Sequence, residues 1–215
     1  MIAPFFDDSH STPVRGFLHR PDQPTGDGLV LAHGASSNCQ APLLSAVAEV
    51  FAEAAWTVLR IDLPYRQLRP HGPPSPATAA RDREGIQSAI NALRRIATGR
   101  LLGGGHSYGG RQASMVAAEQ PGLSDGLVLF SYPLHPPGRP DRPRTEHLAA
   151  LRVPVVFLHG TRDPFGSIEE MRAAIARIPA PVELVVIEGA GHDLGRSHRQ
   201  VAAMARQAVA SAVPT

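Results

Sequence analysis

Short, nearly continuous apolar runs alternate with longer amphipathic runs along most of this chain. Runs such as LVLAH, LVLFS, VPVVFLH and VELVVIE are typical of strands that are buried on both faces of a parallel sheet. The apolar runs predict seven strands: Val14–His19, Gly28–His33, Thr57–Asp62, Arg100–Gly105, Gly126–Ser131, Val153–His159 and Val182–Glu188.

The amphipathic runs between the later strands predict helices. They cover Ala41–Ala55, Ala77–Thr98, Gly110–Glu119, Ser167–Ile178 and Gly195–Ala212. Repeated alternation of strand and helix predicts an α/β fold with a mostly parallel, twisted sheet of about seven strands and helices on both faces. Only the turn segment Pro21–Asp27 separates the first two strands, so we expect them to form an antiparallel pair at the edge of the sheet. With no internal repeat or linker, residues 1–215 are expected to form a single domain.

Two proline-rich loops, Pro64–Pro76 and Tyr132–Pro143, each follow a predicted strand. Their composition predicts irregular structure. Open α/β sheets bind ligands beyond the carboxyl ends of their strands, so both loops are candidate pocket walls, although ordinary surface loops have the same composition. The segment between Ser131 and Val153 is too short for a full cap domain, which predicts a shallow, open site.

Composition and charge exclude several classes of protein. All 21 basic residues are arginines, so neither a Walker A lysine nor a lysine-bound pyridoxal phosphate is available. The formal net charge is only +2 and the arginines are scattered, which argues against nucleic-acid binding. The sequence contains no run of 18 apolar residues, so no membrane span is predicted, and the first residues do not resemble a signal peptide. Because Cys39 is the only cysteine, no internal disulfide is possible, and we expect a cytoplasmic location.

A single Gly-x-Ser-x-Gly motif is centred on Ser107, between an apolar run and a helix-compatible run. This is the setting of a nucleophile elbow, in which a serine occupies a sharp strand-to-helix turn. Gly105 and Gly109 are then required because a Cβ at either position would collide with neighbouring backbone. His106 is expected to point away from the serine into packing.

A serine nucleophile needs a base and a group that orients the base, and in this fold they follow in the order Ser, Asp or Glu, His. Asp163 follows the strand that ends at His159, and His192 follows the strand that ends at Glu188. Each residue has a simpler explanation, because Asp163 suits a turn or a helix N-cap and His192 suits an ordinary loop. Their order and strand-end placement together predict a catalytic triad of Ser107, Asp163 and His192.

Further site residues can be assigned around this triad. The backbone N–H of Tyr108 and that of Ala35, in the turn after an early strand, are candidate oxyanion-hole donors. The side chains of Ser36–Asn38 suit either capping of the next helix or hydrogen bonds within the turn. Candidate substrate-binding residues are Tyr65, Arg111, Tyr132, His135 and Phe165. Arg111, four residues after Ser107, suits either an anionic substrate group or a structural salt bridge beneath the elbow.

The segments HGASSN, GGHSYGGR, HGTRDPFG and GAGHD resemble those of the α/β-hydrolase superfamily, in its small dienelactone-hydrolase-like branch. The segments RIDLPYR and SYPLHPPG are similar to those of a narrower group, which includes bacterial predicted hydrolases and the eukaryotic testis-expressed protein 30. The resemblance runs from about Val14 to the C-terminal helix and implies an α/β-hydrolase fold. Dienelactone hydrolases proper use a cysteine nucleophile, whereas this elbow carries Ser107 and Cys39 lies outside any elbow.

The residues therefore predict a serine hydrolase that cleaves a small ester or thioester, with no metal or cofactor and as a monomer or homodimer. The alternatives are a peptidase or perhydrolase with the same triad, and a non-catalytic interaction module on a hydrolase fold. A dinucleotide-binding motif fails on spacing, because Tyr108 stands where Gly-x-Gly-x-x-Gly needs its third glycine.

Overall fold

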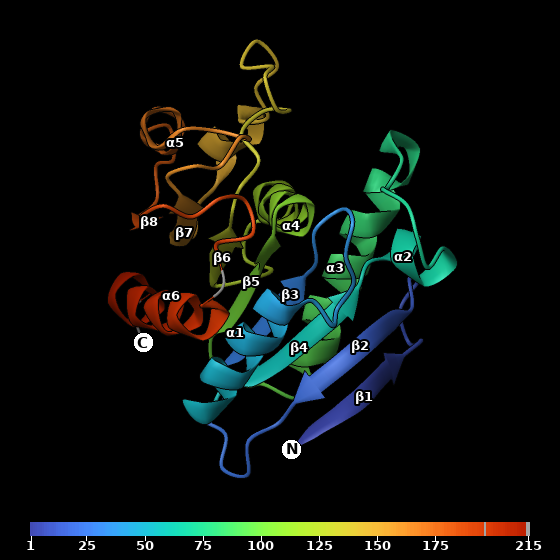
Figure 1. Ribbon diagram of the computed structural model, residues 1–215. Helices are drawn as coiled ribbons and strands as arrows, with labels where there is room; N and C mark the ends of the chain where they lie inside the picture. The colour runs from blue at the N-terminus through green and yellow to red at the C-terminus, as the bar shows by residue number, and fades with distance from the viewer. Residues whose placement is uncertain (196, 214–215) are drawn as a thin grey trace.

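The computed structural model describes residues 1–195 and 197–213, and one mostly parallel sheet of eight strands runs through this part of the chain (Figure 1). The strands are β1 (Ile2–Asp7), β2 (Val14–His19), β3 (Gly28–Ala32), β4 (Thr57–Asp62), β5 (Leu101–His106), β6 (Gly126–Phe130), β7 (Val155–Gly160) and β8 (Val182–Ile187). The α-helices are α1 (Pro42–Glu53), α2 (Pro64–Leu68), α3 (Ala79–Arg94), α4 (Tyr108–Glu119), α5 (Ile168–Ile175) and α6 (His198–Ala212). The predicted fold class is thereby confirmed.

The sheet is ordered β1-β2-β4-β3-β5-β6-β7-β8. Strands β3 to β8 pair in parallel, whereas β2 is antiparallel to both β1 and β4. The parallel strands all end at the same edge, so the loops that follow β3, β5, β7 and β8 gather there. This edge carries the candidate site.

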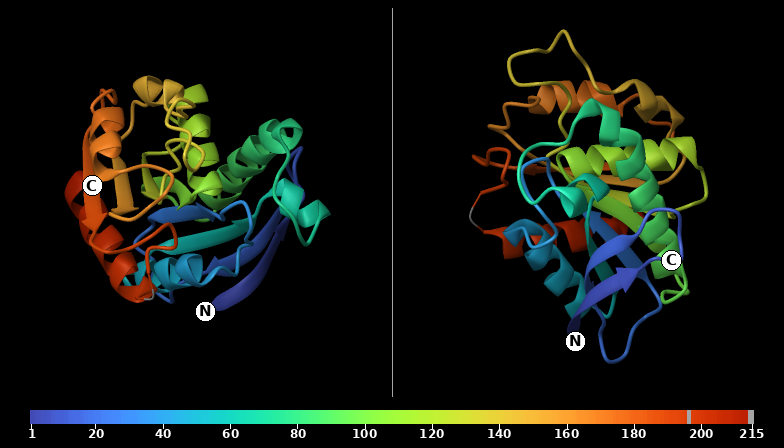
Figure 2. Two further views of the ribbon diagram at one scale, coloured as in Figure 1. Left: turned by 45° about the horizontal axis from the view of Figure 1, so that its top comes forward. Right: turned by 90° about the vertical axis from the view of Figure 1, so that its right-hand side faces the viewer.

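Helices cover both faces of the sheet, as Figure 2 shows from two further directions. Alternate residues of each central strand face opposite layers because side chains alternate across a strand. In β3, Leu29 and Leu31 pack with α1 and α6, whereas Val30 packs with α3 and α4. The strands are therefore buried on both sides, which explains their near-continuous apolar sequence.

The predicted pairing of the first two strands is wrong. β2 does not pair with β3; it crosses to the far side of β4, and the true edge strand is β1, which the sequence analysis missed. β1 exposes Ile2 and Phe6 and contains Pro4, so it lacks the pattern of a buried strand. Because Met1 and Arg20 exchange both backbone hydrogen bonds, Pro4 lies where an N–H would point away from β2, and none is missing from the pair.

Other differences concern the ends of elements. The first proline-rich loop begins with the short helix α2, because Pro64 at the first helical position needs no N–H partner. Helix α4 begins at Tyr108, directly after the serine, rather than at Gly110. The predicted helix Gly195–Ala212 begins at His198 instead, and residue 196 lies outside the described residues. Between β6 and β7 the only helical segment is a 3₁₀ turn, Glu146–Ala150, so the described chain has no full cap.

Two adjacent glycines of β5 provide a test of this packing. A Cβ at Gly104 would lie 2.3 Å from the carbonyl oxygen of Val128, whereas the nearest atom to a Cβ at Gly103 would be Leu127 Cδ2, at 3.4 Å. We expect Gly104→Ala to lower the free energy of unfolding by about 2–3 kcal/mol, because β5 and β6 must separate. Gly103→Ala is the matched control and should change it by less than about 1 kcal/mol. Urea unfolding of both variants measures the difference, and equal midpoints would contradict the register.

Candidate active site

Ser107 lies at the sharp turn between β5 and α4, with a backbone φ of 51° and ψ of −116°. A non-glycine residue rarely adopts this conformation, so the surrounding structure must hold it. A Cβ at Gly105 would lie 2.2 Å from the carbonyl oxygen of Ala32, and a Cβ at Gly109 would lie 2.5 Å from those of Ala32 and His33. Both glycines are thus needed because the turn packs directly on the end of β3.

The structure brings Ser107, His192 and Asp163 into one hydrogen-bonded chain. His192 Nε2 lies 2.8 Å from Ser107 Oγ, and His192 Nδ1 lies 2.8 Å and 3.0 Å from the two carboxylate oxygens of Asp163. The Asp163 side chain is fully buried and also accepts the backbone N–H of Phe165 at 2.9 Å. With the carboxylate facing Nδ1, the proton of a neutral imidazole belongs on Nδ1, which leaves Nε2 free to accept the serine proton.

Two aromatic neighbours hold His192. The ring of Phe165, a predicted substrate-binding residue, lies over the imidazole with centroids 4.2 Å apart. His106 Nε2 donates to the backbone carbonyl of His192 at 2.8 Å. Burial lowers the pKa of His106 from 6.5 to about 4, so it is neutral at pH 7. The sequence analysis placed His106 in simple packing and missed this contact, because it joins residues 86 positions apart.

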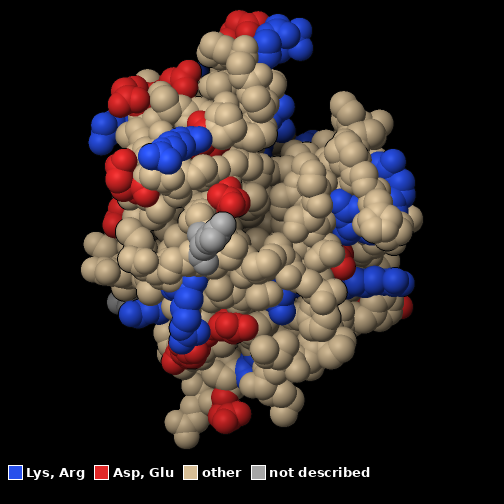
Figure 3. Space-filling view, viewed as in Figure 1, with Lys and Arg blue, Asp and Glu red and all other residues tan. Residues whose placement is uncertain are grey.

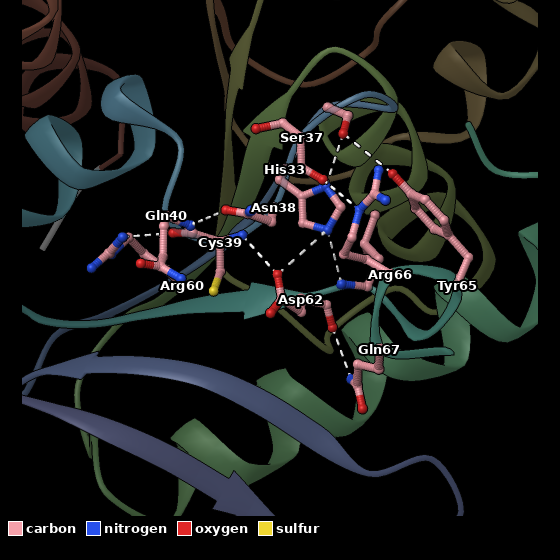
Figure 4. A network of polar contacts seen from close by, with 12 residues as sticks. His33, Ser37, Asn38, Cys39, Gln40, Arg60, Asp62, Tyr65, Arg66 and Gln67 are labelled. Carbon is pink, nitrogen blue, oxygen red and sulfur yellow. Dashed lines mark hydrogen bonds and ion pairs between the residues drawn. The ribbon is translucent and has the colours of Figure 1, made fainter. Parts of the chain in front are cut away.

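The loop after β3, residues 33–38, is called the oxyanion loop here and lies beside the serine. A Cβ at Gly34 would be 3.7 Å from Ser107 Cβ. His33 Nδ1–H donates to the Gly34 carbonyl at 2.8 Å, and its Nε2 accepts the N–H of Leu63 at 3.1 Å. Burial lowers the pKa of His33 to about 4, which keeps this neutral tautomer at pH 7. Figure 4 shows His33 enclosed by the polar side chains that hold the loop.

The predicted oxyanion donors are Ala35 and Tyr108. Within residues 1–195 and 197–213, neither backbone N–H donates a hydrogen bond to the protein. The Tyr108 hydroxyl donates to Asp82 Oδ2 at 2.7 Å, and Asp82 Oδ1 accepts the N–H of Tyr65 at 3.0 Å. Asp82 on α3 thus ties the start of α4 to α2. The sequence analysis missed Asp82, since an acidic residue in a first helical turn is unremarkable.

The other predicted substrate-binding residues lie around this centre in different settings. Tyr65 and Tyr132 are 2% and 1% exposed, and their hydroxyls donate to the backbone carbonyls of Ala35 and Arg144. Both rings therefore support loops, and direct contact with substrate stays a prediction. His135 borders a cavity of about 280 Å³ between the second proline-rich loop and α5. Ser107, Asp163 and His192 do not line this cavity.

Arg111 lies on α4, and its backbone N–H donates to the carbonyl of Ser107 at 2.9 Å. Its Nε is buried and has no hydrogen-bond partner among the described residues. The Arg111 charge, together with burial, lowers the pKa of Arg144 and of His147. The expected salt bridge beneath the elbow is not found in the described part of the chain, and a role toward an anionic substrate group stays a prediction.

A notch separates two lobes at the top of the molecule in Figure 3, and the surface below it is mainly uncharged. In the matching ribbon view, one lobe carries the segment after β6 and the other carries α2 and the start of α3. The two proline-rich loops thus rise on opposite sides of this notch.

Comparison with known proteins agrees with the fold. Residues 26–213 match the alpha/beta hydrolase domain family, and the chain belongs to this family. None of the helices in the described ranges has both the length and the apolar character needed to cross a bilayer.

Solved structures with the same fold cover nearly the whole chain. Dienelactone hydrolase from Anabaena variabilis is 23% identical with a TM-score of 0.80, covering 100% of this chain and 99% of that one. An α/β serine hydrolase without lid from Xanthomonas campestris is 16% identical with a TM-score of 0.78, covering 100% and 96%. The esterase domain of a Rhodothermus marinus protein is 18% identical with a TM-score of 0.74, covering 100% of both chains.

The two neutral histidines predict how stability depends on pH. The pKa values of His33 and His106 are about 4 in the folded protein and near 6.5 in the unfolded chain, so between these values only the unfolded chain binds the protons. Acidification from pH 6.5 to 4 should therefore lower the free energy of unfolding, by about 1.4 kcal/mol per pH unit for each histidine.

Urea unfolding at pH 5 and pH 6 measures this slope. His106→Gln should reduce it by about one proton, whereas the same substitution at the exposed His71 should leave it unchanged. An unaltered slope in the His106 variant would show that this imidazole is already charged in the folded protein.

Proposed function

We propose that this protein is a serine hydrolase that cleaves a small ester or thioester through an acyl-enzyme. The observation that carries the proposal is the hydrogen-bonded chain from Ser107 Oγ through His192 to the buried Asp163 carboxylate, with each contact at about 3 Å or less. Its three members come from the ends of β5, β7 and β8, where hydrolases of this fold carry a nucleophile, an acid and a base. The family supports hydrolase activity in general, and the ester or thioester substrate belongs to the proposal.

In the first half of the reaction, Ser107 Oγ attacks the carbonyl carbon while His192 Nε2 takes the hydroxyl proton. The N–H groups of Ala35 and Tyr108 donate to the oxyanion that forms. Asp163 stabilises the resulting imidazolium and keeps Nδ1 protonated. Collapse of the intermediate expels the alcohol or thiol, which receives the proton from His192.

In the second half, water takes the place of the leaving group. His192 removes a proton from the water as it attacks the acyl-enzyme, and the same two N–H groups hold the second oxyanion. The carboxylic acid leaves and Ser107 recovers its proton. The fixed tautomer of His192 is thus used twice, once in each half of the reaction.

A small acyl group fits the open site, because the described chain between β6 and β7 contains only a short 3₁₀ turn and no full cap. The names of two similar structures, a dienelactone hydrolase and an esterase domain, point to ester bonds. The serine at position 107 separates this chain from a cysteine-dependent dienelactone hydrolase. Parallel assays with short p-nitrophenyl esters, peptide amides and peroxide separate esterase, peptidase and perhydrolase activity.

Labelling with a fluorophosphonate tests the nucleophile. The probe should modify the wild-type protein at Ser107, whose oxygen displaces fluoride at phosphorus, and it should not modify Ser107→Ala. Mass spectrometry of the intact protein reads out one added phosphonyl group. Equal labelling of both proteins would favour a non-catalytic interaction module. The absence of labelling in both, together with negligible rates on every ester, would favour the same interpretation.

Replacing the acid tests the orientation of the base. Asp163→Asn leaves a side chain of the same size but no longer favours a proton on His192 Nδ1, so kcat for p-nitrophenyl butyrate should fall by about 10³–10⁴. Asp141→Asn on the exposed second proline-rich loop should keep wild-type kcat. Circular dichroism must show both variants folded, and near-wild-type turnover in the Asp163 variant would remove it from the mechanism.

A further inference from the structure

We propose that Arg66 is the positioning residue of the oxyanion hole: its guanidinium holds the oxyanion loop against residues 69–73, so that the Ala35 N–H faces the carbonyl oxygen that becomes the oxyanion. This inference rests on the proposed function. Arg66 lies on α2, within the segment RIDLPYR, and none of the reaction steps above uses its side chain.

The Arg66 side chain joins two loops. Its Nε donates to the Ser37 carbonyl at 2.7 Å and its Nη2 to the Ala35 carbonyl at 3.3 Å, both in the oxyanion loop. On the other side, its Nη1 donates to the Arg69 carbonyl at 3.1 Å and its Nη2 to the Gly72 carbonyl at 3.0 Å. Figure 4 shows Arg66 lying between Tyr65 and the loop that carries Ser37. One rigid fork therefore sets the spacing of both loops.

No acidic side chain in the described part of the chain pairs with the charge of Arg66. The residue is only 7% exposed, and among the described residues its hydrogen bonds go to backbone carbonyls alone. A buried cation costs free energy unless its donors are satisfied, and these four loop carbonyls satisfy them. The arrangement fits a residue that fixes backbone rather than one that balances a carboxylate.

Tyr65 acts beside Arg66 on the peptide groups around Ala35. The Tyr65 hydroxyl lies 2.8 Å from the Ala35 carbonyl and 3.3 Å from the Gly34 carbonyl, and the Arg66 guanidinium lies over the Tyr65 ring at 5.0 Å. In a trans peptide the N–H points opposite to the preceding carbonyl, so holding the Gly34 carbonyl directs the Ala35 N–H. Holding the Ala35 carbonyl as well prevents the next peptide from rotating. Both planes that flank the proposed donor are thereby fixed before substrate binds.

The contact with residues 69–73 extends the same control to the rim of the site. This segment belongs to the first proline-rich loop, on one side of the notch that Figure 3 shows. Because Arg66 reaches both loops at once, the rim and the oxyanion hole are held in one geometry. A lysine at position 66 would carry all its N–H donors on one ammonium group and could not bridge the two loops.

The test uses Arg66→Lys in the full chain, with Arg69→Lys as the matched control. Arg69 is exposed, and among residues 1–195 and 197–213 its guanidinium donates only to the Pro73 carbonyl within its own loop. With p-nitrophenyl butyrate, Arg66→Lys should lower kcat by about 10² and change KM by less than about threefold, because a misdirected donor is lost chiefly in the transition state. Its affinity for butylboronic acid, whose adduct with serine carries an anionic oxygen, should fall by a similar factor. Arg69→Lys should match the wild type in both.

Tyr65→Phe supports the same test if Arg66→Lys folds poorly. It keeps the ring and removes only the hydroxyl that holds the Gly34 and Ala35 carbonyls, so kcat should again fall more than KM rises. Wild-type kcat and boronic-acid affinity in folded Arg66→Lys would overturn the proposal, as would equal losses in Arg66→Lys and Arg69→Lys.

A readout independent of turnover separates this inference from the proposed function. The Ser37 N–H donates to Gly34 within the oxyanion loop at 3.1 Å. Its hydrogen exchange should be at least tenfold faster in Arg66→Lys than in Arg69→Lys. If the wild type hydrolyses none of the esters, the proposed function fails, but the exchange measurement still tests whether Arg66 holds the oxyanion loop. An unchanged exchange rate in Arg66→Lys would overturn this role of Arg66, whatever the activity.

Discussion

The close approach of the Ser107 turn to the end of β3 is the constraint on which the site depends. Two carbonyl oxygens, of Ala32 and His33, occupy the space where side chains at Gly105 and Gly109 would lie. The contact fixes the strained serine, and it also brings the oxyanion loop alongside, because that loop begins at the same two residues. The nucleophile and its proposed oxyanion donor are thus aligned by one packing event in the backbone.

Around that contact, N–H donors of buried side chains hold the backbone carbonyls of the loops. Neutral His33 and His106 each donate one N–H to a loop carbonyl, and Arg66 donates to four. Groups held in this way need little reorientation when charge develops, which is the physical basis of electrostatic preorganisation. Burial keeps both imidazoles uncharged at pH 7, because it lowers their pKa values to about 4. The loops around the serine are therefore held partly by imidazoles that acid would charge and partly by the guanidinium fork of Arg66.

The sequence was most informative where a residue's position follows from local order along the chain. The placement of Ser107, Asp163 and His192 at one edge follows from parallel strands that end together, so strand-end motifs were enough to group them. Contacts between distant segments leave no such pattern. The bond from His106 to the carbonyl of His192, the ties to Asp82 and the Arg66 fork all depend on how separate loops pack. The insertion of β4 between β2 and β3 escaped prediction for the same reason, since a short connection alone favours a hairpin.

The edge strand β1 has a consequence for the behaviour of the protein at high concentration. Ile2 and Phe6 are more than half exposed, and an exposed edge strand with apolar side chains favours pairing with a strand from a neighbouring molecule. Pro4 lies between them on the outward-facing side of the backbone, so an incoming strand would find an acceptor but no donor at the centre of the edge. The proline thus works as a gatekeeper against intermolecular β-pairing, at no cost to the pairing inside the sheet.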